Sequence, residues 1–423
     1  MRKQLCLVLV ALVVMVVLAV ESQAAIEVPS VASTQNLSVD SYTATLPLDK
    51  ASWTGFSLSS LSFSCNTTVD GSVGDVLSLI PNSGSNSSSV VSGTSNLTGV
   101  FDIVINPGSG LLGNTAALAA FNRAAELWEA RISDPITVTI DADMSSLPSG
   151  VIGSTTTVFV ESGYSTVRDL MVSDAMNEPD DTIAQLLPTA AQFTASVPSP
   201  IWLNGNIMAA KANLKALGVS GLDDQFGASD ADISFSTQFA FDFDKSNGIT
   251  PGTMDFESIA AHEIGHALGF VSIIDPIDFM MGFEVDMPVD PLDLFQFQDG
   301  TMDPETLAEF TTTTRCLVPN VERNTDQIDG WGTLTADEIP MSTGYYNGDG
   351  RQASHWKDDM LTGNWLGIMD PTFDYGDVVV PMESDFRALD LIGYEISPVP
   401  EPSVWILFAF ATVLMAARSR PLQ

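Results

Sequence analysis

The stretch from His262 to Phe270 reads HEIGHALGF and constrains this chain more than any other. On a helix, His262 and His266 lie one turn apart on the same face, so both imidazoles can bind one cation. Glu263 stands beside them, where it can take a proton from a water, and Gly269 can end the helix with a sharp turn. The pattern H-E-x-x-H-x-x-G predicts a zinc site, although the same spacing also arises by chance in unrelated helices.

Histidine is scarce, since the chain has three and two of them fall inside this motif. The third, His355, precedes a tryptophan in Ala-Ser-His-Trp. We expect it to be the third ligand, because three neutral imidazoles leave a strongly Lewis-acidic metal. Asp275 and Glu284 are alternative third ligands, because carboxylates also bind zinc.

These residues give the chain a resemblance to metzincin-type zinc metalloproteases, in which a third histidine and a methionine-containing turn complete the site. Ser272 stands where the extended metzincin motif has its third histidine. A late histidine before Trp instead resembles leishmanolysin-like enzymes, with residues 271–354 as the insertion. Met369, in Gly-Ile-Met-Asp-Pro, is then the turn methionine beneath the ligands. The resemblance extends to secreted bacterial metalloproteases that carry a PEP-CTERM tail.

The resemblance implies an α+β fold: a helix-backed, twisted mixed sheet with the active-site helix, followed by a mostly irregular C-terminal subdomain. It also implies an endopeptidase that hydrolyses extracellular proteins or peptides, with a zinc-bound water and Glu263 as general base. The alternative is a non-catalytic surface or matrix binding protein with a structural zinc. Glu263 favours the enzyme, because a structural site does not need a general base. Candidate oxyanion stabilisers are Tyr345, Tyr346 and Tyr375.

Both ends of the chain resemble targeting segments. Residues 1–24 combine a basic start, an apolar run and small residues before Ala25, which predicts a signal peptide. Residues 398–423 hold a Pro-Glu-Pro motif, an apolar run shorter than the roughly 20 residues of a spanning helix, and arginines. This tail resembles a PEP-CTERM sorting signal, which implies an exosortase-type processing enzyme and transient membrane association. A transmembrane anchor is the alternative, and either places the body of the protein outside the cytoplasm. The resemblance to the sorting signal implies the outside or the cell surface of a Gram-negative bacterium.

The chain is strongly acidic, with 53 Asp and Glu against 16 Lys and Arg and a net charge of −37. Nucleic acid is therefore excluded as a partner, because polyanion binding needs a basic surface. The stretch 242–248 loosely resembles a calcium loop, but its glycine is one place late and no terminal glutamate follows. A polar turn is the better interpretation, so calcium is only a weak second cofactor prediction.

Residues 25–99 are rich in Ser, Thr, Asn and Gly and are expected to be a leader and linker, with some β-structure. Residues 100–397 carry the patterns of the catalytic domain. Expected strands are 101–105, 136–140, 155–160 and 233–244, and expected helices are 114–132, 207–217 and 383–392, the last ended by Gly393. By the resemblance, strand 233–244 is the antiparallel edge strand that pairs with substrate; an ordinary core strand is the alternative.

Two cysteines remain in the expected mature body, Cys65 and Cys316. A disulfide between them, two free thiols, and a zinc-capping role for Cys65 in a propeptide are all compatible with the sequence.

Overall fold

The computed structural model describes residues 41–45 and 64–69 by their backbone, and residues 100–178, 181–300, 303–304, 306–327 and 338–397. Three predictions fall outside the described residues. They are the signal peptide, the remainder of the leader, and the C-terminal sorting tail, for which an anchor was the alternative. Within the described ranges, no helix has the length and apolar character needed to cross a membrane.

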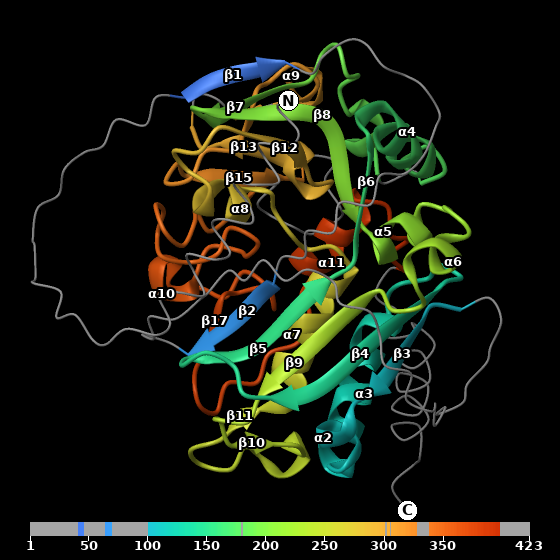
Figure 1. Cartoon of the computed structure of the whole chain (residues 1–423), viewed down its shortest axis with the longest axis vertical. Coiled ribbons are helices and arrows are strands. Elements are labelled where there is room, and N and C mark those ends of the chain that lie inside the picture. Colours follow the sequence, from blue (N-terminus) through green and yellow to red (C-terminus); the bar gives the residue numbers. More distant parts are fainter. Residues whose placement is uncertain are drawn as a thin grey trace, which may run out of the picture. The chain divides into compact units, whose positions relative to one another are not determined.

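The described chain combines helices with mixed β-sheets, which confirms the α+β class. The first sheet has the strand order β17-β2-β5-β9-β4-β3 (Figure 1). Its strands are β2 (Ser64–Val69), β3 (Asp102–Pro107), β4 (Thr137–Ser145), β5 (Val151–Thr157), β9 (Ala231–Ser236) and β17 (Thr372–Phe373). β3, β4 and β9 are parallel, whereas β5 runs antiparallel to both β9 and β2.

Two helices, α3 (Thr115–Glu129) and α7 (Phe256–Leu268), pack together and against this sheet. α3 connects the parallel strands β3 and β4, as a parallel pair requires a crossover. It begins where the Asn114 side chain accepts a hydrogen bond from the Ala117 N–H, and its apolar side chains at helical spacing are buried. The Trp128 indole N–H donates to the Ala261 carbonyl at 3.0 Å, which ties α3 to α7 inside the core.

A second sheet has the strand order β1-β7-β14-β13-β15-β16 and combines strands from the expected leader, the first half of the body and the expected insertion. Its strands are β1 (Ser41–Thr45), β7 (Thr194–Pro198), β13 (Gln296–Gln298), β14 (Arg315–Cys316), β15 (Arg323–Asp326) and β16 (Glu338–Pro340). A third sheet, in the order β12-β8-β6, comprises β6 (Phe159–Gly163), β8 (Ile201–Ala210) and β12 (Val285–Val289). β10 (Phe241–Asp242) pairs with β11 (Met254–Asp255). The region after residue 270 therefore holds more β-structure than the mostly irregular subdomain that was expected.

The remaining helices are short and connect these sheets. They are α2 (Ser109–Leu112), α4 (Tyr164–Ala175), α5 (Lys211–Ala216), α6 (Leu222–Phe226), α8 (Ile274–Phe279), α9 (Leu307–Phe310), α10 (Asp359–Thr362) and α11 (Glu383–Leu391). Single 3₁₀ turns are η1 (Ala184–Leu186), η2 (Lys245–Asn247) and η3 (Leu292–Phe295). α11 confirms the expected helix 383–392, and Gly393 follows it at a φ of 103°.

Three of the expected elements are wrong in their extent or place. The strand expected at 233–244 ends at Ser236, and as β9 it lies between β5 and β4 instead of at an edge. The expected strand 155–160 spans a break, because β5 and β6 belong to different sheets. The expected helix 207–217 includes the end of β8, and helix α5 begins only at Lys211. Apolar residues continue past each of these breaks, so the pattern alone did not show where the chain turns.

Cys316 lies in β14 and is a buried, free thiol. β14 belongs to the second sheet, whereas Cys65 belongs to β2 in the first. The disulfide considered from the sequence is therefore not formed in this structure.

Candidate metal centre

Helix α7 carries His262 and His266, the two histidines of the motif, and both are buried in the protein. It begins at Asp255, whose carboxylate accepts hydrogen bonds from the backbone N–H and the hydroxyl of Ser258. It ends at Gly269, whose φ of 112° is the left-handed conformation that glycine adopts without strain, as the sequence predicted. His262 and His266 are one turn apart on this helix and are fully buried.

His355 comes from a loop far along the chain, and the buried carboxylate of Asp275 holds that loop in place. Asp275 accepts hydrogen bonds from the backbone N–H groups of Ala353 and Ser354 and from the Ser354 hydroxyl. The Ser354 hydroxyl in turn accepts from the Ser272 N–H at 2.9 Å. Asp275 thus positions the candidate ligand and does not compete with it.

The three histidines meet at their Nε2 atoms. Nε2 of His266 lies 3.1 Å from that of His262 and 3.2 Å from that of His355, and the third distance is 3.3 Å. The rings of His262 and His355 are nearly parallel, while the His266 ring stands steeply across both. The structure therefore assembles one cluster from α7 and from a loop 89 residues away. Glu284, the other alternative ligand, is exposed and not part of it.

The contacts of the opposite ring nitrogens indicate the tautomer of each histidine. Each Nδ1 faces a backbone carbonyl: His262 faces Ile368 at 2.7 Å, His266 faces Phe270 at 2.8 Å, and His355 faces Gln352. Because a carbonyl only accepts, each Nδ1 carries the proton and each Nε2 presents a lone pair.

Burial keeps all three imidazoles neutral. Desolvation lowers the pKa of His262 to about 4. Desolvation, together with the neighbouring histidines, lowers the pKa of His266 and of His355 well below its usual value. Three neutral rings with converging lone pairs are suited to hold a cation, since no hydrogen lies between them.

The spacing can be compared with that of a tetrahedral site. A zinc ion about 2.0–2.1 Å from each imidazole nitrogen, at tetrahedral angles, places those nitrogens about 3.3–3.4 Å apart. The observed separations of 3.1–3.3 Å are close to this spacing. Calcium and magnesium prefer oxygen ligands, whereas imidazole suits zinc, copper, iron and nickel. The residues present therefore fit a transition-metal ion held by three nitrogens.

Met369 packs closely against Gly265 of helix α7. Met369 is fully buried, and a Cβ added to Gly265 on α7 would lie 2.3 Å from the Met369 sulfur. Gly265, which lies between the two motif histidines in the sequence, thus leaves the space that Met369 fills. The role of Met369 as a turn methionine stays a prediction from the resemblance.

Asp385, in the first turn of helix α11, holds the chain segment of Ile368 and Met369 in place. Its carboxylate accepts hydrogen bonds from the Trp356 indole N–H at 2.7 Å and from the backbone N–H groups of Ile368 and Met369. Asp385 thereby links Trp356, which follows His355, to the turn whose Ile368 carbonyl contacts Nδ1 of His262. No sequence pattern pointed to this aspartate, because its partners lie elsewhere in the chain.

Glu263 is buried against strand β5. The Thr155 hydroxyl lies 2.6 Å from Glu263 Oε2 and 3.0 Å from the Glu263 backbone carbonyl. A Cβ added to Gly153 would lie 2.3 Å from Oε1 of the same carboxylate, so this glycine leaves the room that Glu263 occupies. Gly153 could have been suspected from the sequence, since a glycine inside a strand often marks a close approach.

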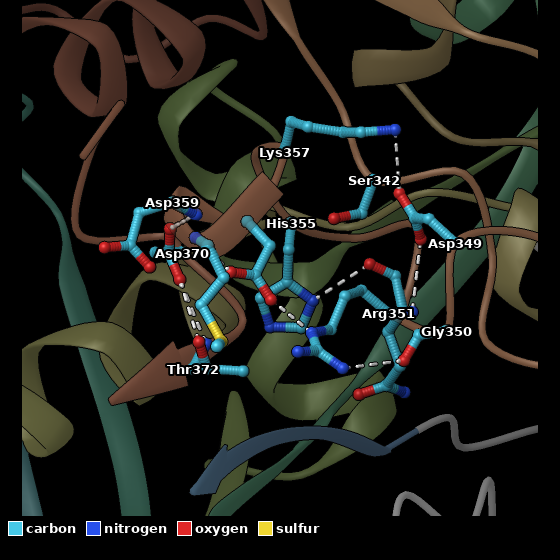
Figure 2. A network of polar contacts seen from close by, with 12 residues as sticks. Ser342, Asp349, Gly350, Arg351, His355, Lys357, Asp359, Asp370 and Thr372 are labelled. Carbon is cyan, nitrogen blue, oxygen red and sulfur yellow. Dashed lines mark hydrogen bonds and ion pairs between the residues drawn. The ribbon is translucent and has the colours of Figure 1, made fainter. Parts of the chain in front are cut away.

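A polar network surrounds His355 in Figure 2. Asp349 accepts a hydrogen bond from the Arg351 backbone N–H and pairs with the Lys357 ammonium. Asp370, next to the turn methionine, accepts from the backbone N–H groups of Asp359 and Thr372. These contacts brace the loop on both sides of His355.

The weak calcium prediction finds no support in the loop 242–248. There the Asp242 carboxylate accepts from the Asp244 and Thr250 N–H groups, and Asp244 accepts from Ser246. These carboxylates close a polar turn, and among the described residues they belong to no group of potential metal ligands. Of the tyrosines considered as oxyanion stabilisers, Tyr345 and Tyr346 pack on each other and Tyr346 packs on Phe279.

No protein-family model matches the chain, and neither a characterised protein nor a solved structure is significantly similar to it.

Proposed function

We propose that this protein is a zinc-dependent endopeptidase with a metzincin-like catalytic domain, acting on proteins or peptides outside the cytoplasm. The observation that carries the proposal is the cluster of three neutral, fully buried imidazoles whose Nε2 lone pairs converge, with Glu263 next to His262 on the same helix. Three protein ligands are typical of catalytic zinc sites, which keep a fourth position open.

His262, His266 and His355 would hold the zinc. When bound, such an ion polarises a carbonyl and acidifies a water molecule. Glu263 accepts the proton of the attacking water and returns it to the leaving amine. Thr155 keeps the Glu263 carboxylate turned toward β5, and the three carbonyl contacts at Nδ1 fix the direction of the imidazoles.

The competing proposal is a surface or matrix binding protein with a structural metal. Its site would more often have four protein ligands, whereas the cluster here combines three histidines with a carboxylate held by a hydroxyl. The acidic net charge of −37 argues against nucleic acid as a partner. The location outside the cytoplasm and the exosortase-type partner remain predictions from the residues of the two ends.

The test combines metal analysis with peptide cleavage. The purified chain should contain about one zinc per molecule, cleave casein, and lose cleavage with a chelator. Glu263→Gln keeps the shape of the side chain, so it should retain the metal while cleavage falls by a factor of about 10² or more. Equal cleavage by this variant and the unaltered chain would refute the enzyme.

A further inference from the structure

Cationic side chains lie on and against the loop that carries His355. Arg323 donates from Nη2 to the Ala353 carbonyl, Arg351 stands four residues before His355, and Lys357 stands two residues after it. A cation beside a metal ligand can bind an oxygen of the substrate only if one of its N–H groups is open. These three side chains differ in this respect.

Arg323 and Lys357 are already engaged by the protein. Arg323 is fully buried, so a substrate does not reach it, and its Nε donates to the Gln296 side chain. The Lys357 ammonium is paired with the carboxylates of Glu322 and Asp349, at 2.8 and 3.1 Å. Both cations therefore support the structure of the loop.

Arg351 keeps one edge of its guanidinium open. Its Nε donates to the buried Asp358 carboxylate and its Nη1 to the Gly350 carbonyl at 3.4 Å, and the side chain is 19% exposed. Within the described part of the chain, Nη2 has no hydrogen-bond partner and is not buried. Its two N–H groups can therefore reach a ligand.

The orientation of Arg351 is fixed from several sides. Its backbone N–H donates to Asp349, and it forms an isolated bridge with Gly344. Asp358 is itself held in place, because it is fully buried and accepts from the Met360 N–H. A donor that is positioned in advance needs little rearrangement when a charge develops beside it, which makes it effective in catalysis.

The Arg351 guanidinium lies near His355. In Figure 2 the Arg351 side chain extends from the loop toward the His355 ring. Burial and the neighbouring His262 lower the pKa of His355, and the positive charge of Arg351 lowers it further, which requires the two groups to be close. A substrate oxygen bound beside His355 is therefore within range of this cation.

We propose that Arg351 is a catalytic residue of this site, and that its Nη2 donates a hydrogen bond to the oxygen of the scissile carbonyl as that oxygen becomes negative. The inference rests on the proposed peptidase function and names an oxyanion stabiliser, for which the sequence offered only tyrosines. The water oxygen bonds to the carbonyl carbon, and the π electrons move to the carbonyl oxygen. These electrons return when the C–N bond breaks, and the proton held by Glu263 goes to the leaving amine.

The first experiment measures steady-state cleavage of a peptide by full-length, zinc-loaded chains. Arg351→Met keeps an unbranched stem but has no N–H group. Its kcat should fall at least about a hundredfold while KM changes less than about threefold, because the lost bond forms only in the transition state. Arg168→Met is the matched control, since Arg168 is 17% exposed, donates to the Leu187 carbonyl and pairs with Asp169. Equal kcat in the two variants would overturn the inference.

A second measurement separates binding of the oxyanion from support of the loop. Its probe is a phosphinic peptide, in which an anionic phosphinate replaces the scissile amide and imitates the tetrahedral intermediate. Arg351→Met should bind this probe at least about a hundredfold more weakly than Arg168→Met, with equal zinc content in both. Weaker binding that is accompanied by loss of zinc would assign Arg351 to the support of His355 and overturn the inference.

A conservative change covers the case in which Arg351→Met does not fold. Arg351→Lys keeps a cation but lacks the planar fork that contacts Asp358 and a substrate oxygen together. Its kcat and its affinity for the phosphinic peptide should both fall at least about tenfold, by similar factors. Unchanged values of both would overturn the inference.

The two measurements also separate this inference from the proposed function. Cleavage at equal rates by Arg351→Met and Arg168→Met would leave the peptidase in place and refute the role of Arg351. Weaker phosphinate binding by Arg351→Met, without peptide cleavage by any chain, would leave Arg351 as a ligand of the anionic oxygen and refute the peptidase.

Discussion

The Thr155 hydroxyl donates a hydrogen bond to Glu263, 2.6 Å from Oε2, and so ties strand β5 to the helix that carries two of the three histidines. The same hydroxyl lies 3.0 Å from the Glu263 backbone carbonyl. Two residues along β5, the Thr157 hydroxyl donates to the His266 carbonyl at 3.0 Å. The strand thus sets the position of the proposed general base, Glu263, and of one candidate ligand, His266, relative to the sheet.

Thr155→Val should lower kcat about ten- to a hundredfold with little change in KM. Valine keeps the shape of threonine but lacks the hydroxyl, and a hydrogen bond to a charged group contributes about 1.5–3 kcal/mol. Thr194→Val is the control, because it removes a threonine hydrogen bond, with Thr314, that lies in the second sheet and away from the candidate site. Steady-state peptide cleavage by both variants measures the effect, and an equal loss in both would contradict a specific role for Thr155.

Gly153→Ala should reduce cleavage at least about tenfold while zinc content stays near that of the unaltered chain. The added Cβ would lie 2.3 Å from Glu263 Oε1, so the carboxylate has to move. A small displacement of a catalytic group can cost about two orders of magnitude in rate. Ser154→Ala, at the neighbouring position of the strand, is the control. Full activity in Gly153→Ala would show that the Glu263 position does not matter.

His355→Ala should lose most of its zinc after dialysis, whereas Asp275→Asn should keep it. His355 is one of the three converging nitrogens, while both Asp275 oxygens accept hydrogen bonds from Ala353 and Ser354. Asn offers only one acceptor, so this variant should unfold at a lower temperature than the unaltered chain. Metal analysis and thermal unfolding measure the two effects, and loss of zinc only in Asp275→Asn would reverse the assignment.

Glu178→Gln should stabilise the protein increasingly as the pH rises. Burial, followed by the charges of Asp390, Asp174, Asp181 and Glu395, raises the pKa of Glu178 to about 9. A carboxyl with a raised folded pKa keeps its proton in the folded state longer than in the unfolded state, so the unaltered chain loses stability between pH about 4.5 and 9. Glutamine does not titrate, so the variant does not lose stability in this pH range.

Thermal unfolding of the Glu178→Gln variant and of the unaltered chain, each at pH 5 and pH 8, measures whether the gain in stability increases with pH. The gain at pH 8 should be about 2–4 °C, the shift that 1 kcal/mol produces in a large domain, and smaller at pH 5. Glu126→Gln, at an exposed position of α3, should show no such trend. A gain that is larger at pH 5 would contradict the pKa direction.

The local elements of the site could be predicted because their determinants are close in sequence. The spacing of His262, Glu263 and His266 requires a helix, and Gly269 ends that helix as expected. The pattern of α3 was likewise readable, because buried side chains recur at helical spacing along 114–132. The scarcity of histidine pointed to His355 without any knowledge of the fold.

The order of strands could not be predicted, because pairing joins residues that are distant in sequence. Strand 233–244 had the alternation of a half-buried strand, but that pattern is the same at an edge and in the centre of a sheet. Only the pairing placed β9 inside the sheet and β5 next to the leader strand. The contacts of Gly153 and Thr155 with Glu263 follow from that placement.

The sequence by itself determined that two histidines and a carboxylate share one helix, because the geometry of a helix is local and repeats every turn. The tertiary structure alone decided how the loop that carries His355 is held, that Asp275 and Asp385 support the turns around the cluster, and that β2 lies beside β5. These arrangements depend on where buried polar groups find partners, and a chain pattern carries no information about partners more than a few residues away.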